Sequence, residues 1–418
     1  MNPILSSEFL IPDSEAHVMP DGRLYIYGSQ DKYEPDTWCS HEYRVFSCDN
    51  SKLENWVDHG VSFQNHKENG QVPWAKGEKL YAPDAIYKDG KYYLYFCGTR
   101  SIEGVATSDR PEGPFTDAKM IQIANGDSID PAIFVDDDGS AYYFWGQYEL
   151  RGAKLKEDMC TIEESTLNRC ILNCIEHGFF EGSSIRKYNG KYYLVYCDCS
   201  RGKPTCLSYA ISDTPLGPYK KQGTIIDNIY CDPDTLNNHG SIECFNGQWY
   251  VFYHRACNGT KFWRRVCAEP IFFDADGHIA EVEMTSNGAS APLDAFSTIP
   301  ASCACRLWPR AHIHMELADG KMKEWVVGKY VRSFVLQFIE YKYLNFGNGA
   351  NRCTITVKGN CTVRLRTSDN RICGSCRSSG DAVQTLTFDI DKISGIAPIA
   401  FEFDEGDFEF FDFSFSNK

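Results

Sequence analysis

The chain has 418 residues and a formal net charge of −15, with 42 lysines and arginines against 57 aspartates and glutamates. This acidic excess argues against a nucleic-acid partner, because phosphate contacts need a basic face, and no run of about 18 apolar residues predicts a membrane span. The first residues carry neither the basic nor the apolar segment of an export signal. We therefore expect a cytoplasmic protein whose 19 cysteines are reduced thiols.

Five segments in the first part of the chain share one form, a turn dipeptide ending in glycine followed by an aromatic-rich strand. They begin at Asp21, Asp89, Asp138, Asn189 and Asn246. Asn-Gly or Asp-Gly between aromatic runs is a strong hairpin signal. The spacing between starts holds about four short strands, which is one blade of a β-propeller. Five copies predict five blades, and a β-sandwich pair or a jelly roll is the less favoured alternative.

The pattern changes after about residue 290. Residues 291–300 resemble a linker, and six short alternating runs follow, from 333–339 to the phenylalanine-rich run 408–415. Such a series predicts a β-sandwich of the jelly-roll type. We expect an all-β protein in which a five-bladed propeller spans residues 1–300 and a sandwich spans residues 310–418.

A polar residue precedes each of the five turns. Asp13, Asp130 and Glu181 lie eight residues before their turns, His239 lies seven and Asp84 lies five. The innermost strands of a propeller line its axis, so these side chains are expected to meet at one end of the central channel. Taken singly, each has a structural explanation, since Asp beside Pro forms turns. Carboxylates in apolar strand contexts are nevertheless unfavourable unless they are used or paired.

Paired carboxylates across a channel are what glycoside hydrolysis requires. One carboxyl group must be protonated to donate a proton to the leaving oxygen, and the other must be ionised to deprotonate a water molecule. A third carboxylate nearby can raise the pKa of the acid by like-charge repulsion. The sequence offers three such groups with one common offset.

The motifs around these residues resemble glycoside hydrolase family 43 over about residues 1–300. They are Tyr81-Ala-Pro-Asp-Ala-Ile, Ser128-Ile-Asp-Pro-Ala-Ile, Phe180-Glu-Gly-Ser-Ser and Asn238-His-Gly-Ser. The resemblance implies a five-bladed propeller and an inverting hydrolase that releases arabinose or xylose from small oligosaccharides without a required cofactor. It implies that Asp13 is the general base, Glu181 the general acid, and Asp130 the residue that tunes and orients the acid.

The resemblance extends to a metal and departs at one point. His239 resembles a channel histidine that lies near a calcium ion or a water cluster in many family members, so a structural calcium in the channel is expected. Many members have Asp-Pro at the base, whereas this chain has Pro12-Asp13. Glu15 and Asp31 are the alternatives to Asp13.

Further residues are expected to contact the sugar. Trp74 is a candidate stacking platform, although a core or rim position fits it equally well, and Asp84 and His239 are candidate polar contacts. Strand alternation sends only one of Arg264 and Arg265 inward. The sequence does not distinguish them, and we take Arg265 as the substrate contact.

The C-terminal region resembles carbohydrate-binding module family 6 in its closing run, and it could bind sugar, brace the propeller or complete the cleft. Two other functions remain open. One is a sugar-binding propeller without catalysis. The other is a related five-bladed glycosidase or a phosphorylase of different sugar specificity, and a phosphorylase would need a basic phosphate pocket. The sequence leaves open the sugar, the linkage, exo or endo action and the oligomeric state.

Overall fold

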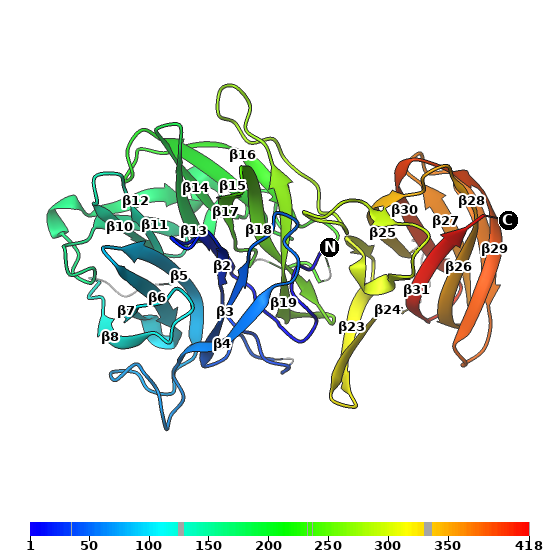
Figure 1. Cartoon of the computed structure of the whole chain (residues 1–418), viewed down its shortest axis with the longest axis horizontal. Coiled ribbons are helices and arrows are strands. Elements are labelled where there is room, and N and C mark those ends of the chain that lie inside the picture. Colours follow the sequence, from blue (N-terminus) through cyan, green and yellow to red (C-terminus); the bar gives the residue numbers. More distant parts are fainter. Residues whose placement is uncertain (35, 124–128, 232, 236, 330–336, 418) are drawn as a thin grey trace.

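A computed structural model describes residues 1–417 except 35, 124–128, 232, 236 and 330–336. Within these residues nearly all regular structure is β-strand, which confirms the predicted all-β class (Figure 1). The helical segments are short: η1 (Thr99–Ser101), η2 (Glu164–Thr166), α1 (Cys174–His177) and η3 (Ala301–Cys303). None of the helical segments in this described part is long and apolar enough to cross a membrane.

Five antiparallel sheets follow one another along the first part of the chain, and in each the strands pair in sequence order. Sheet by sheet they are β1 (Glu15–Val18), β2 (Leu24–Tyr27), β3 (Glu42–Cys48), β4 (Val57–Gln64); β5 (Leu80–Lys88), β6 (Lys91–Gly98), β7 (Ile102–Ser108), β8 (Thr116–Met120); β9 (Ala132–Val135), β10 (Ala141–Trp145), β11 (Glu149–Lys154), β12 (Asn168–Asn173); β13 (Phe179–Tyr188), β14 (Lys191–Asp198), β15 (Cys206–Ser212), β16 (Lys220–Asp227); and β17 (Ser241–Phe245), β18 (Gln248–Cys257), β19 (Thr260–Ile271).

The first strands of these sheets, β1, β5, β9, β13 and β17, contact one another in a closed ring. Aromatic side chains fill the space between neighbouring sheets. Tyr95 of β6 and Tyr143 of β10, for example, have ring centroids 5.4 Å apart within one buried cluster. The ring brings the beginnings of the inner strands to a common centre.

The N-terminal residues connect the first sheet to the fifth. Ile4 N donates to Val266 O at 3.1 Å, and the Asn2 side chain donates to Glu269 Oε1 at 2.8 Å. A parallel bridge between Ser14 and Gly240 adds a contact between the approaches to β1 and β17. These bonds close the ring through the start of the chain.

The five turn dipeptides lie between the first and second strands of the five sheets, which confirms the predicted hairpins. At Asn189-Gly190 both residues have positive φ, 48° and 74°, as a two-residue type I′ turn requires. Glu181 was expected just ahead of the strand that precedes this turn. It lies inside β13 instead, between two register shifts against β14.

The second region consists of two sheets, each with strands in mixed order. The first contains β20 (Leu293–Asp294), β22 (Arg306–Trp308), β25 (Gln337–Asn345), β27 (Cys361–Thr367), β28 (Ile372–Ser378) and β30 (Ile396–Asp404). The second contains β21 (Ile299–Pro300), β23 (Ala311–Ala318), β24 (Lys321–Gly328), β26 (Ala350–Gly359), β29 (Gln384–Ile393) and β31 (Phe408–Ser416).

The pairing of β20 with β25 places the start of this region at Leu293, earlier than the expected residue 310. The expected run 333–339 lies mostly outside the described residues. The phenylalanine-rich run 408–415 does not alternate strictly between buried and less buried positions. Phe410 and Phe413 are both buried, because Phe411 occupies an extra position where the pairing with β26 shifts register.

The second region lies beside the first five sheets, with the C-terminus at its far end (Figure 1). Leu307 N donates to Tyr230 O at 2.9 Å, and Asn258 N donates to Ile313 O at 2.7 Å. Arg265 of β19 pairs with Glu324 of β24 at 2.6 Å. Backbone bonds and a largely buried ion pair therefore join the two regions.

Candidate active site

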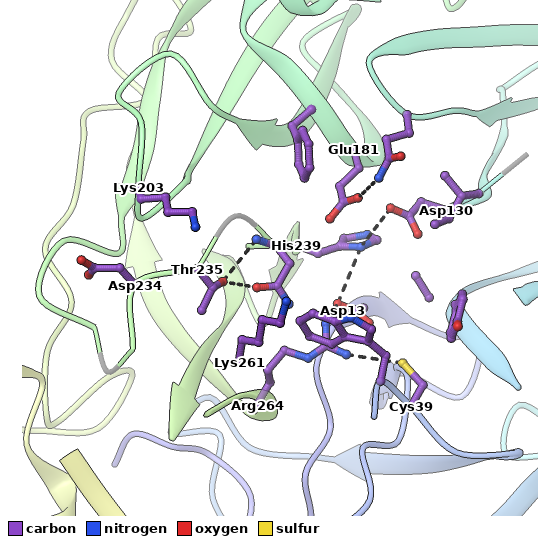
Figure 2. Close-up of a pocket in the computed structure, with 17 residues that line it drawn as sticks. Asp13, Cys39, Asp130, Glu181, Lys203, Asp234, Thr235, His239, Lys261 and Arg264 are labelled. Atoms are coloured by element: carbon purple, nitrogen blue, oxygen red, sulfur yellow. Dashed lines mark hydrogen bonds and ion pairs between the residues drawn. The ribbon is translucent and has the colours of Figure 1, made fainter. Parts of the chain in front are cut away.

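A cavity of about 350 Å³ lies where the inner strands begin. Asp13, Asp130, Glu181 and His239 line it, each just before or within the first strand of a different sheet (Figure 2). The structure thus brings together four of the five polar residues that the repeat analysis placed at one end of the channel.

The backbone before the inner strands explains how these side chains reach one space. Asp13 and Asp130 have φ of 54° and 55°, a left-handed conformation that aspartate tolerates better than most residues. The fourth sheet uses Gly182, with φ of 64°, directly after Glu181. A Cβ atom at Gly182 would lie 2.8 Å from Cγ of His239. Glycine there lets the histidine ring pack against the strand that carries Glu181.

Asp13 is held by donors on both oxygens. Arg264 Nη1 lies 2.9 Å from its Oδ1, and Ser29 Oγ donates to its Oδ2 at 2.6 Å. Burial alone would raise the pKa of Asp13, but the charge of Arg264 and the bond from Ser29 bring the pKa below its usual value. Asp13 is therefore ionised at neutral pH, as a general base must be.

Glu181 has the opposite character. Burial raises its pKa to about 7, the charge of Asp13 adds to this effect, and a hydrogen bond from Gln147 opposes it. In that bond Gln147 Nε2 donates to Glu181 Oε2 at 2.6 Å. A carboxyl group with this pKa remains substantially protonated near neutral pH and can donate a proton.

Asp130 is the third carboxyl group. It accepts a hydrogen bond from Gly182 N at 3.0 Å. Burial and the charges of Glu181 and Asp13 raise its pKa well above the usual value. His239 lies between the two aspartates, with Nδ1 3.9 Å from an oxygen of each. Burial lowers the pKa of His239, so the imidazole is neutral at neutral pH.

The aromatic wall of the cavity differs from the prediction. Trp38, from the segment between β2 and β3, and Phe180 of β13 line it. Trp74 is not among the described lining residues. Its indole stacks on Phe96 at 6.3 Å against a buried cluster of the first two sheets, so its position is that of a packing residue. Nothing in the hairpin repeats indicated Trp38, because it belongs to an irregular connection.

The arginine assignment was also wrong. Arg264 of β19 points to the cavity, where it pairs with Asp13 at 2.9 Å and with Asp31 at 2.8 Å (Figure 2). Arg265, the next residue, points away from the cavity and forms an ion pair with Glu324. Strand alternation predicted that only one would face inward. Asp31, which the sequence left as an alternative base, forms an ion pair with Arg264 and is not among the described cavity-lining residues.

Asp84 lies deeper in the channel than expected and does not line the cavity. It accepts hydrogen bonds from Ile133 N at 2.8 Å and pairs with His17 Nε2 at 2.7 Å. The second sheet lines the cavity with Tyr81 and Ala82, and Tyr81 lies eight residues before Asp89. The eight-residue offset of the other carboxylates would have selected Tyr81, whereas the preference for a carboxylate selected Asp84.

The expected calcium can be tested against the donors present. Among the described residues, the metal-ligand side chains that gather most closely are Glu15, His17 and Asp84, with ligand atoms within 4.8 Å of one another. His239 does not belong to this group. Calcium takes six to eight oxygen ligands, and the carboxylates facing His239 are already bound by Arg264 and Gly182. The site fits a cation poorly at His239 and better at the deeper group, where Glu15 Oε1 has no hydrogen-bond partner in the described structure.

Several cavity residues carried no sequence signal. Gln147, Lys203 and Lys261 line the cavity from connections or strand ends outside the repeated motif. Only Gln147 could have been suspected, because it lies two residues after the aromatic strand β10. The others depend on how loops fold over the channel mouth.

Comparison with known proteins identifies the family. The profile of glycosyl hydrolases family 43 matches residues 1–279. A xylosidase/arabinosidase of Thermoclostridium stercorarium is 34% identical over 350 residues, 73% of this chain and 72% of the relative. Another, from Humicola insolens, is 35% identical over 338 residues, 67% of this chain and 98% of the relative.

Solved structures agree with this result. A family 43 β-xylosidase/α-arabinofuranosidase from a compost metagenome, solved with xylotriose in a calcium-free form, has a TM-score of 0.58 and 32% identity. It covers 68% of this chain and 97% of that one. An arabinoxylan arabinofuranohydrolase of Bacillus subtilis matches along the whole of this chain and 97% of its own, with a TM-score of 0.60; at 24% identity it supports the fold alone. Because the profile covers well over half of the sequence, this protein belongs to glycosyl hydrolases family 43.

Proposed function

We propose that this glycosidase hydrolyses xylosides or arabinofuranosides in small oligosaccharides with inversion at the anomeric carbon. The observation that carries the proposal is the divergence of pKa within one cavity, where the pKa of Asp13 is lowered and that of Glu181 is raised to about 7. Environments that separate the pKa values of two carboxyl groups assign the base and the acid. The names of the relatives and the xylotriose in a neighbouring structure support the substrate class.

In the proposed reaction Glu181 protonates the glycosidic oxygen as the bond to the anomeric carbon breaks. Asp13 removes a proton from a water molecule that attacks the opposite face of the sugar. Ser29 and Arg264 orient the Asp13 carboxylate from its two oxygens. Trp38 offers an apolar face on which a sugar ring can stack.

Asp130 and His239 support this pair without reacting. Asp130 accepts a hydrogen bond from the backbone N of Gly182, directly after Glu181, and so orients the strand segment that carries the acid. The neutral imidazole of His239 lies between the carboxyl groups of Asp13 and Asp130 and keeps them apart. No organic cofactor takes part in these steps.

A nitrophenyl glycoside screen tests the activity. Release of nitrophenol from the xyloside or the arabinofuranoside, and not from the galactoside, is expected. Binding of pentosides without any turnover would instead favour a sugar-binding propeller. A requirement for inorganic phosphate would favour a phosphorylase.

The finer architecture belongs to the same proposal. The five sheets are taken as the blades of a five-bladed propeller, with residues 1–300 as the expected catalytic domain, trimmed to end before Leu293. The two later sheets are taken as a jelly-roll sandwich like carbohydrate-binding module family 6. A reducing, cytoplasmic location is proposed from the use of cysteine in this chain, which has 19 cysteines.

A structural cation in the channel would be held by Glu15, His17 and Asp84 rather than by His239. Metal analysis of the purified protein and its melting temperature with and without a chelator test this. We expect the melting temperature to fall on chelation and to return when calcium is added. An unchanged melting temperature in metal-free protein would contradict the cation site and leave the hydrolase proposal intact.

A further inference from the structure

The mouth of the cavity carries two lysines that the hydrolysis mechanism does not use. Lys203, from the connection between β14 and β15, and Lys261 of β19 both line the cavity. Figure 2 shows both ammonium groups directed toward the central space, whereas the carboxylate of Asp234 points away from it. Neither lysine lies within 4.0 Å of a described carboxylate oxygen.

Some other positive side chains of the first five sheets do have carboxylate partners. In the fourth sheet, Lys221 lies 2.6 Å from Asp198, and Lys187 lies 2.6 Å from Asp136. The cavity arginine, Arg264, is already committed to Asp13 and Asp31. The two lysines are the positive charges among the described lining residues that form no ion pair within 4.0 Å, although the charge of Lys203 opposes the burial-raised pKa of Asp234.

Aromatic rings hold one of the two in place. Lys261 Nζ lies 5.4 Å from the ring centroid of Trp38 and 5.1 Å from that of Phe262. A cation over a ring face is stabilised by the quadrupole of the ring. Because Trp38 is also the proposed stacking residue for the sugar, Lys261 lies next to the wall of the cavity that would contact substrate.

The floor of the cavity does not attract an anion. Asp13 is ionised, and burial raises the pKa of Asp130 and Glu181 toward the neutral form. A charged group on the substrate would therefore remain at the mouth, while the neutral pentose enters the floor.

We propose that Lys203 and Lys261 form a subsite for a carboxylate on the sugar next to the cleaved pentose. The preferred substrates are then acidic oligosaccharides, in which a uronic acid branch neighbours the scissile bond. The inference rests on the proposed hydrolase function and names the substrate class within it. An ammonium group partly exposed to solvent favours a carboxylate by about two- to fivefold, and salt weakens this preference.

The test compares two substrates that differ only in charge. One is a xylo-oligosaccharide with a glucuronic acid branch beside the cleaved residue, and the other is its carboxyl-reduced counterpart with a glucose branch. The readout is the ratio of kcat/KM for the acidic and the neutral substrate. We expect a wild-type ratio of about 4 to 25 at low ionic strength, falling toward 1 at high salt.

Variants assign the effect to the two side chains. Lys203→Met and Lys261→Met each remove one ammonium group, so each should lower the ratio by about two- to fivefold. The double variant should bring the ratio close to 1. Lys156→Met, at an exposed lysine outside the cavity, should leave the ratio unchanged. If a variant fails to fold, the wild-type ratio still tests the subsite, because a preference that comes from charge must weaken as salt is added.

The outcomes separate the two proposals. A wild-type ratio at or below 1, or one that the double variant does not change, would overturn the acidic subsite while the neutral substrate is still hydrolysed. Stimulation of neutral-substrate cleavage by inorganic phosphate would assign the ammonium groups to phosphate and also overturn it. Failure to cleave either substrate would overturn the hydrolase proposal and this inference with it.

Discussion

Two groups of buried acidic residues lie along the same central channel. One contains Asp13, Asp130 and Glu181 and faces the cavity. The other contains Glu15 and Asp84, two or three residues further along the inner strands, where they meet His17 and Arg186. Asp13, Asp130, Glu15 and Asp84 are almost fully buried and Glu181 is half-buried, so burial alone does not separate the two groups.

The difference lies in what each carboxylate can reach. Asp84 accepts bonds from Ile133 N and Ala85 N and pairs with His17, and it does not line the cavity. Asp13 and Glu181 have bound oxygens too, but they adjoin a space large enough for a sugar. A buried carboxylate becomes a candidate catalyst only where the fold leaves room for substrate beside it.

The largest expected effect contrasts Glu181→Gln with Asp84→Asn. Loss of the general acid should lower kcat by about 10²- to 10⁴-fold without lowering the melting temperature. Asp84→Asn should destabilise the protein by about 1–3 kcal/mol, because a buried donor loses its acceptor, with a far smaller change in kcat. Thermal unfolding and turnover of an aryl pentoside are measured for both variants. Equal losses of kcat in the Glu181 and Asp84 variants would contradict the distinction between the catalytic group at the cavity and the structural group deeper in the channel.

A tryptophan pair gives the next effect. Trp38→Ala should raise KM about 10-fold, since the sugar loses its stacking face. Trp74→Ala should leave KM near the wild-type value and lower the free energy of unfolding by about 2–3 kcal/mol, because its ring packs on Phe96. Steady-state kinetics and denaturant unfolding check both. A raised KM in the Trp74 variant alone would restore the sequence-based assignment.

The smallest effect is a shift in pH dependence. Glu181 must be protonated to act, so kcat/KM should fall as pH rises through about 7. Gln147 donates to Glu181 and favours its ionised form. Gln147→Leu should therefore raise the pKa of Glu181 and move the alkaline limb to higher pH. Gln222→Leu, at an exposed glutamine, is the matched control, and a limb that moves to lower pH in the Gln147 variant would contradict this role.

The sequence predicted the hairpins and three cavity carboxylates because both depend on local, repeated signals. Turn dipeptides set the strand ends, and a common offset from them placed Asp13, Asp130 and Glu181 together. In the second sheet we chose a carboxylate, Asp84, that does not have the eight-residue offset from the turn. That prediction failed, because the residue at the common offset, Tyr81, lines the cavity and Asp84 does not. Trp38, Lys203 and Lys261 come from connections or strand ends without a repeat. Arg264 and Arg265 differ only in strand phase, which the register of β19 decides.

The most direct test of the account is the anomeric form of the first sugar released, followed by proton NMR during early turnover of a nitrophenyl β-xyloside or α-arabinofuranoside. With Asp13 as base and Glu181 as acid on opposite faces of the sugar, the product first appears with inverted configuration. A β-xyloside would give α-xylose before mutarotation. A first product of retained configuration would mean that a carboxylate attacks the sugar directly, and it would contradict the assignment of Asp13 as a base acting on water.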